Sequence, residues 1–101
     1  MNFQTRTTGD ALEILISGRL TYEDHEQFRE MITSIDGSPG QRIVFDFSDL
    51  AFIDSAGLGM LVVAKDLAAA KAMTVQMRNA KDLVGKLMTL VKFHDVIPVA
   101  D

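Results

Sequence analysis

The sequence predicts a single α/β domain, residues 1–101, with a mixed, mostly parallel sheet of about five strands and three main helices. Two observations lead to this fold class. Two kinds of segment alternate along the chain. Those with alternating or continuously apolar residues predict strands, and those whose apolar residues recur at helical spacing predict helices. Apolar residues make up 48% of the chain and charged residues 24%, which suits a buried core under an ordinary polar surface. Repeated strand–helix–strand units require right-handed crossovers and therefore parallel strands.

Two strands are expected first, as an antiparallel hairpin. Residues 11–17 are mostly apolar with a partial period of two, which predicts a strand buried on at least one face. Gly18 is expected to end this strand. Residues 3–7 should pair with it through the turn dipeptide Gly9-Asp10.

The first helix is expected to begin after Leu20, with Thr21 as its N-cap. Asp24 stands three residues further on and completes a weak form of the capping box. Phe28 and Ile32 then follow at helical spacing, so one stripe of this helix should face the core. The run Gly-Ser-Pro-Gly at residues 37–40 is expected to stop it.

The second half of the chain predicts two more helices and three more strands. The run at residues 42–47 is the most hydrophobic strand, as a central parallel strand should be. The elements expected after it are a helix at residues 55–72, a strand at 73–78, a helix at 81–91 and a short edge strand at 96–99. In the helix at 81–91, the residues expected on one buried face are Leu83, Val84, Leu87, Met88 and Val91.

Composition excludes several classes of function. The net charge is −4 and the ten basic residues are scattered, which argues against binding to nucleic acid or to an anionic membrane. The absence of cysteine excludes disulfides, zinc thiolate sites and thiol nucleophiles. His25 and His94 lie far apart without a motif, so no catalytic metal site is expected. Residues 1–6 contain no apolar signal region and no apolar run reaches the length of a membrane span, so a cytoplasmic protein is expected.

The most informative segment is residues 52–61, where a buried strand passes into a helix. Ser55 stands where an N-cap is expected, and the simplest interpretation is that it only caps the helix while Gly57 and Gly59 allow close packing. However, glycine in a helix costs about 1 kcal/mol relative to alanine, and this helix begins with two. They suggest that another group must approach this backbone closely.

The first turns of this helix are also apolar around almost the whole circumference. A helix in a small domain cannot bury every side, so part of this surface should be exposed, unless a loop covers it. An exposed apolar patch beside a serine hydroxyl is typical of a docking surface. The residues expected to bind a partner there are Thr21, Asp54, Ala56, Gly57, Leu58, Gly59 and Met60.

The run Phe-Ser-Asp-Leu-Ala-Phe-Ile-Asp-Ser-Ala-Gly-Leu-Gly at residues 47–59 closely resembles the signature of STAS domains of the anti-sigma factor antagonist family. The resemblance extends over nearly the whole chain, including residues 18–20, 43–46 and 93–99. It implies the STAS fold and a phosphorylated serine at Ser55. It further implies a partner kinase with a GHKL-type ATPase fold, often an anti-sigma factor, and a metal-dependent Ser/Thr phosphatase of the PPM type.

Two positions depart from the pattern of this family. Many members carry Asp where this chain has Thr21, which leaves partner contacts near that residue open. The residue after the phosphorylated serine is often a second Ser or Thr, and here it is Ala56. Ser55 is therefore the one hydroxyl available at the motif. Phosphate on it would place charge inside an apolar docking patch and so weaken partner binding.

Other functions find weaker support. A serine nucleophile on a Gly-x-Ser-x-Gly elbow would need glycine at position 53, which is Ile53. A nucleotide-binding Gly-x-Gly-x-x-Gly turn starting at Gly57 would need its third glycine at Val62, and no other cofactor motif is present. The chain is therefore expected to have no catalytic activity. The remaining alternative is a STAS module that binds its partner without phosphorylation, as in lipid-transport assemblies.

Overall fold

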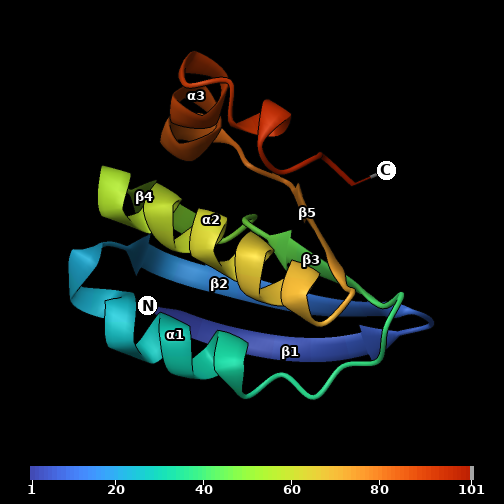
Figure 1. Ribbon diagram of the computed structural model, residues 1–101. Coiled ribbons are helices and arrows are strands. Elements are labelled where there is room, and N and C mark those ends of the chain that lie inside the picture. The colour runs from blue at the N-terminus through green and yellow to red at the C-terminus, as the bar shows by residue number, and fades with distance from the viewer. Residues whose placement is uncertain (101) are drawn as a thin grey trace.

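The computed structural model describes residues 1–100 as five strands, three α-helices and two short 3₁₀ turns (Figure 1). The strands are β1 (Asn2–Thr8), β2 (Ala11–Leu20), β3 (Arg42–Asp46), β4 (Leu50–Ile53) and β5 (Thr74–Arg78). The helices are α1 (His25–Thr33), α2 (Ser55–Ala70) and α3 (Asp82–Leu90), and the 3₁₀ turns are η1 (Tyr22–Asp24) and η2 (Phe93–Asp95).

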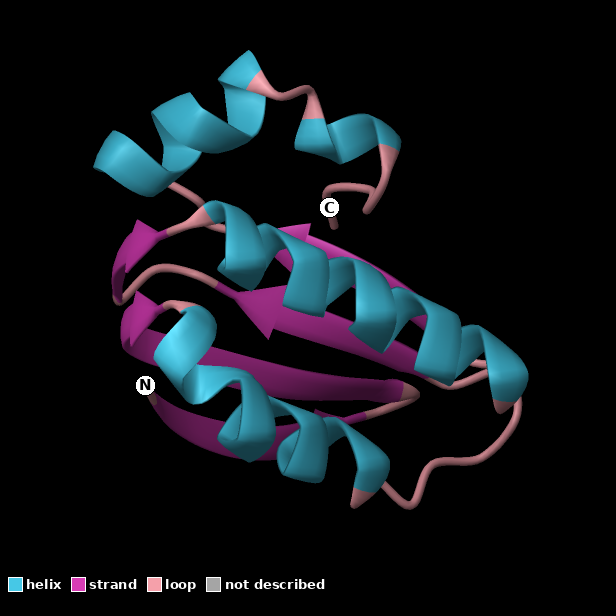
Figure 2. Ribbon diagram, turned by 60° about the vertical axis from the view of Figure 1, so that its left-hand side comes forward, coloured by secondary structure: helices cyan, strands magenta, loops and turns pink. Residues whose placement is uncertain are grey.

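The sheet is mixed and mostly parallel, as the sequence predicts. Its order is β1-β2-β3-β5, and β4 pairs with the second half of β2 beyond the end of β3. Only the β1–β2 hairpin is antiparallel. Helices α1 and α2 lie side by side across one face of this sheet, while α3 stands apart and packs against β4 (Figures 1 and 2). The right-handed crossovers expected of strand–helix–strand units account for this arrangement.

The core lies between the sheet and the two packed helices. Each fully buried aliphatic or aromatic side chain contributes about 1.5–3 kcal/mol of hydrophobic free energy, so this cluster is what holds the layers together. The largest fully buried side chains are Phe45, Phe47, Ile14, Ile16, Leu20, Ile43, Ile53, Leu61, Ile97 and Val84.

The opposite face of the sheet carries a polar network around Glu13, which is only 8% exposed. Its carboxylate accepts hydrogen bonds from Arg6 (3.0 Å), from the hydroxyl of Thr8 (2.9 Å) and from Arg78. A buried carboxylate is tolerated only when it is paired and hydrogen-bonded in this way. Arg78 also reaches the carboxylate of Asp46, so the network connects β1, β2, β3 and β5.

The second strand is longer than the sequence predicts. Gly18 does not end it, because a positive φ of 84° and a β-bulge between Gly18 and Arg19 let β2 turn and continue to Leu20. This extension is paired with β4, the buried strand expected just before the helix at residue 55, whose bounds the sequence pattern does not define.

The prediction of an edge strand at residues 96–99 is wrong. Within residues 96–100, Val99 alone forms a bridge, which is isolated and joins it to Met77 of β5. The Met77 N–H donates to the carbonyl of Pro98 (2.9 Å), and the Ala100 N–H donates to the carbonyl of Met77 (2.8 Å). Pro98 has no N–H of its own to extend the ladder, so the pairing remains a single bridge.

The predicted buried face of α3 is only partly correct. Val84 and Met88 are buried and Leu87 is half-buried, but Leu83 and Val91 are exposed. The apolar pattern of α3 is wider than the surface available to cover it, because α3 packs mainly along β4 and η2. None of the helices within residues 1–100 has the length and apolar character that crossing a membrane requires.

Candidate functional site

The candidate site is built at the junction between β4 and α2, and Asp54 organises it. Asp54 keeps the extended backbone of the strand, and its carboxylate accepts the N–H of Gly57 at 2.7 Å. Asp54 is therefore the N-cap of α2, and the prediction that Ser55 is the N-cap is wrong by one residue. The cap satisfies one of the free N–H groups that begin every helix.

Gly57 is required by the close approach of the chain's own backbone. A Cβ atom at this position would overlap the carbonyl oxygen of Leu20 and the side chain of Ile53. Gly59 is different, since a Cβ there would meet open space. The structure thus supports the simplest interpretation at Gly57, which allows close packing against β2, and shows no close approach at Gly59.

The turn η1 is held by a hydrogen bond to the same junction between β4 and α2. The backbone N–H of Tyr22 donates to the second carboxylate oxygen of Asp54 (3.3 Å), and the N–H of Thr21 donates to Asp24 (2.9 Å). The second bond belongs to the predicted capping box between Thr21 and Asp24, which is present but caps η1, whereas the N-cap of α1 itself is Asp24. Burial by itself would raise the pKa of Asp24, but the bond from Thr21 and the nearby N-terminal ammonium outweigh burial and hold this pKa below its ordinary value.

Ser55 is the first residue of α2 and its side chain is exposed. Within residues 1–100 its hydroxyl has no hydrogen-bond partner. The backbone N–H of Leu58 bonds the Asp54 carbonyl (3.0 Å) and that of Gly57 bonds the Asp54 side chain, so the N–H groups of Ser55 and Ala56 stay free. An anion attached to Ser55 would meet these donors and the positive end of the helix dipole.

The structure brings the predicted partner-binding residues together but exposes only some of them. Gly57 and Met60 are buried in the described chain, although Met60 lines the groove between α1 and α2, and a partner contact at these two residues stays a prediction. Ala56, Leu58, Asp54 and Thr21 are half-buried, while Gly59 is exposed beside Ser55. At about 100° per residue, Ser55 and Gly59 lie on the same outward stripe of α2.

A groove between α1 and α2 adds residues that the motif does not contain. It has a volume of about 370 Å³, and its lining includes Tyr22, His25, Val63 and the edge of Gly59. The rings of Tyr22 and His25 stack at 4.7 Å, and Tyr22 and Val63 are 66% and 47% exposed. Tyr22 was not among the residues expected to bind a partner, and Val63 lies in the middle of α2, within the apolar run of which part was expected to be exposed.

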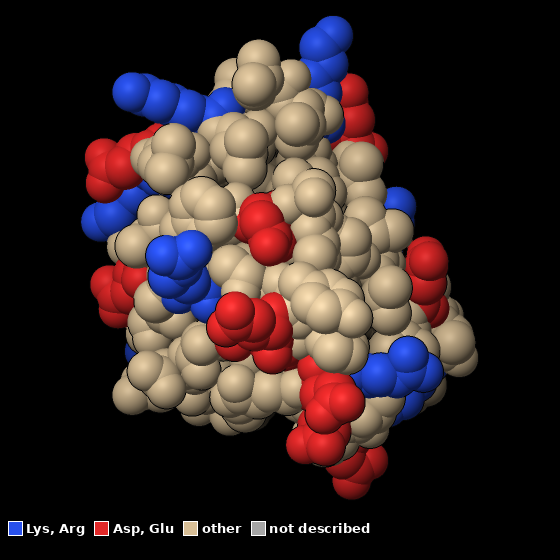
Figure 3. All heavy atoms as spheres, turned by 90° about the vertical axis from the view of Figure 1, so that its left-hand side faces the viewer, with Lys and Arg blue, Asp and Glu red and all other residues tan. Residues whose placement is uncertain are grey.

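The surface around the start of α2 is largely uncharged, with acidic side chains across its centre and lower part (Figure 3). Asp54 and the exposed Glu23 and Glu26 belong to this end of the molecule. A further negative charge on Ser55 would lie near these acidic side chains and would repel a partner that is anionic here.

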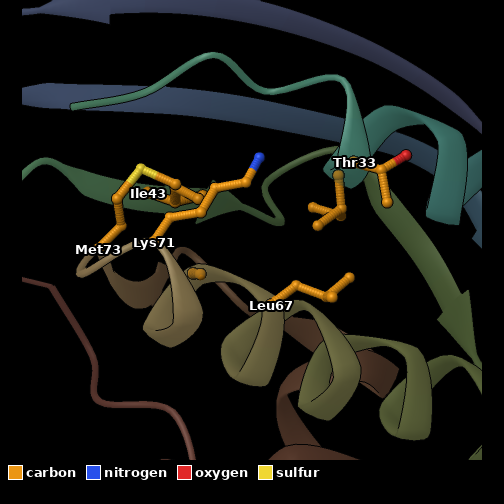
Figure 4. A pocket seen from close by; sticks show the side chains of 7 residues that line it. Thr33, Ile43, Leu67, Lys71 and Met73 are labelled. Carbon is orange, nitrogen blue, oxygen red and sulfur yellow. The ribbon is translucent and has the colours of Figure 1, made fainter. Parts of the chain in front are cut away.

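A second, smaller hollow of about 100 Å³ lies at the other end of the α1–α2 interface (Figure 4). Its lining includes the apolar side chains of Ile43, Leu67 and Met73. The Lys71 ammonium donates to the carbonyl of Ile35 (2.9 Å) beside it. Its lining also includes Lys71 and Thr33, and the Thr33 hydroxyl donates to the carbonyl of Arg29 (2.9 Å), so both polar side chains are engaged in bonds to the backbone. Within residues 1–100, moreover, no three His, Asp or Glu side chains are grouped closely enough to hold a metal ion.

Comparison with known proteins connects this geometry to one family. Residues 3–98 match the family model described as "Mlab, STAS domain". A STAS-domain containing protein of Pseudomonas aeruginosa (strain UCBPP-PA14) is 27% identical over 92 residues, which cover 91% of this chain and 90% of that protein.

Three solved structures have the same fold over most of this chain. The unphosphorylated form of the anti-sigma factor antagonist SpoIIAA superposes with a TM-score of 0.75 at 22% identity, covering 99% of this chain and 89% of that one. The phosphorylated form of Bacillus SpoIIAA gives a TM-score of 0.69. The murine anion transporter Slc26a9 matches with a TM-score of 0.71 at 17% identity, over 89% of this chain and 15% of the transporter.

Proposed function

Because the chain belongs to the STAS domain family, we propose that it is a non-catalytic partner-switching protein of the anti-sigma factor antagonist type. Its unphosphorylated form binds a serine kinase of the GHKL type in the cytoplasm. The kinase transfers the γ-phosphoryl group of ATP to the Ser55 hydroxyl, ADP leaves, and the phosphorylated protein is released. A PPM-type phosphatase hydrolyses the phosphoester and resets the switch.

The observation that carries this proposal is the exposed hydroxyl of Ser55 at the first position of α2. It has no partner within the described chain, it stands over free backbone N–H groups, and it borders the groove between α1 and α2. A kinase can reach such a hydroxyl, and a docked partner must cover it.

Phosphorylation should leave the fold almost unchanged and alter the surface. The phosphate would carry about −1.5 to −2 charges, and the start of a helix stabilises nearby negative charge by about 0.3–1 kcal/mol. A partner that buries the phosphate without pairing it loses several kcal/mol. Since each 1.4 kcal/mol is a factor of ten, an affinity loss on the order of a hundredfold is expected from local repulsion alone.

Substitutions of Ser55 test the switch. Ser55→Ala should bind the kinase with the affinity of the unphosphorylated protein and resist release by ATP. Ser55→Asp should bind about a hundredfold more weakly, because its charge lies in the docking surface. The measurement is isothermal titration calorimetry with a GHKL-type kinase encoded beside this gene.

The matched control is Ser38→Asp, which adds the same charge on the exposed loop between α1 and β3. It should keep wild-type affinity. Equal affinities for the wild type, Ser55→Ala and Ser55→Asp would contradict the proposed mechanism.

A second function is favoured by the match to the "Mlab, STAS domain" model and by the likeness to a transporter STAS domain. In this function the same surface holds a partner permanently, within a transport or other signalling complex, and Ser55 stays unmodified. Mass spectrometry of the protein purified from its own host separates the two. Phosphate on Ser55 supports the switch, whereas an unmodified Ser55 in a lasting complex supports the permanent module.

A further inference from the structure

The two edges of the sheet differ in whether their backbone groups are paired. At the β5 edge, the C-terminal segment forms hydrogen bonds with both the N–H and the carbonyl of Met77. At the other edge, β1 pairs only with β2, and all seven residues from Asn2 to Thr8 are exposed. Figure 2 shows β1 as the outermost strand on that side. The outer side of β1 therefore presents unpaired backbone donors and acceptors.

The hairpin determines which residues carry these free groups. Thr8 and Ala11 close a two-residue turn in which Gly9 has a φ of 60°. The closing pair of such a turn exchanges hydrogen bonds, and bonded pairs then alternate along the ladder. The backbone groups of Thr8 and every second residue before it therefore face β2. Those of Phe3, Thr5 and Thr7 face outward.

This edge lacks the features that usually prevent strand pairing. Natural edge strands are protected by Pro, by Lys, by bulges or by being short. The segment Asn2–Thr8 contains neither Pro nor Lys, and its register with β2 is unbroken. Its one charge, on Arg6, is neutralised by the ion pair with Glu13 at 3.0 Å.

We propose that β1 pairs with β1 of a second copy of this chain, antiparallel, with the two-fold axis through Thr5. In this register Thr5 faces Thr5, and Phe3 faces Thr7 of the second copy, so every outward backbone group finds a partner. Gln4 lies opposite Arg6 of the second copy, so no two like charges lie opposite each other. Phe3, 38% exposed in the monomer, gains an aromatic–β-branched contact of the kind that stabilises sheets.

A second copy suits this edge because the same short strand satisfies both sides of the axis, as a two-fold interface requires. Pairing along a single strand buries less than the roughly 1,000 Å² typical of a stable interface. The dimer is therefore weak and concentration-dependent. The dimer interface does not include Ser55, so a failure of this proposal would not contradict the proposed switch.

Cysteine crosslinking tests the register, because the chain has no cysteine of its own. Thr5→Cys places two thiols opposite each other at the axis, within the spacing of less than about 7 Å that a disulfide needs. In Thr7→Cys, the matched control, the two thiols are separated by four residues along the strands, about 13 Å. With oxidised glutathione as oxidant, Thr5→Cys should form a covalent dimer on a non-reducing gel and Thr7→Cys should not. Equal crosslinking of both variants, or none, would overturn the register.

Analytical ultracentrifugation tests the dimer itself. The apparent mass of the wild type should rise toward twice that of the monomer as concentration increases to the millimolar range. Thr5→Pro removes an outward N–H and keeps the β1–β2 ladder, since proline is tolerated where an edge N–H faces solvent. It should remain folded by circular dichroism and stay monomeric. A wild type that is monomeric throughout would overturn the proposal and leave the edge to a strand of another protein.

Discussion

Gly57 and Gly59 stand two residues apart in α2, yet their surroundings differ. At Gly57 the carbonyl of Leu20 and the side chain of Ile53 occupy the space of a Cβ atom, while at Gly59 that space is open. The helix therefore needs glycine at the first position for packing. At the second position nothing within residues 1–100 requires glycine, and a role of Gly59 in binding a partner stays a prediction.

Alanine substitutions separate these two roles. Gly57→Ala should lower the free energy of unfolding by about 1–3 kcal/mol, because the new methyl group pushes α2 away from β2. Gly59→Ala should raise it by about 1 kcal/mol through helix propensity alone. Urea unfolding measures both changes, and two variants of equal stability would contradict the packing described for Gly57.

The N-cap of α2 lies one residue before the position that the local sequence pattern predicts. Asp and Ser are both favourable N-caps, so the dipeptide Asp54-Ser55 does not decide between them. The choice depends on where the extended backbone of β4 ends, and pairing of Leu20 with Ile53 sets that end. As a result Asp54 caps the helix and the Ser55 hydroxyl is left free.

Among the elements, α3 illustrates the limit of helical periodicity. Its apolar residues predict a helix at the correct place, but they do not tell which of them are covered. Met88 is 4% exposed and Leu90 is 79% exposed, although they belong to the same helix. Neighbouring β4 and η2 cover one side of α3, and the other side faces solvent.

Substitutions in α3 should reflect this difference. Met88→Ala should lower the free energy of unfolding by about 2–5 kcal/mol, because it leaves a cavity in the core. Leu90→Gln should change it by less than about 0.5 kcal/mol, as for most surface substitutions. Thermal or urea unfolding measures both. A large loss for Leu90→Gln would show that its side chain is covered in solution.

For the molecule as a whole, the two faces of the sheet respond differently to acid. The helix-covered face is apolar, whereas the other face depends on carboxylates held by several donors. Burial alone would raise the pKa of Asp46, but hydrogen bonds from Ser48 and Asn79 and the charge of Arg6 outweigh burial and hold this pKa below its ordinary value.

A lowered pKa in the folded state makes stability depend on pH. The contribution of Asp46 is complete above the pKa of an unfolded aspartate, about 3.9, and is lost as the pH falls through the lower pKa of the folded state. The wild type should therefore be less stable at pH 3 than at pH 7. Asp46→Asn should show a smaller difference between the two, measured by urea unfolding. An equal difference in both proteins would contradict this role of Asp46.

The sequence by itself determined the fold class, the three helices, the N-terminal hairpin and the position of Ser55 at the start of α2. These follow from local periodicity, turn residues and a short motif. Only the tertiary structure decided that β4 pairs with the end of β2, that residues 96–99 form no strand, that Asp54 is the cap, and that Gly57 packs against β2. Such features depend on which strands pair and which surfaces a neighbouring element covers, and both are contacts between residues far apart in the chain.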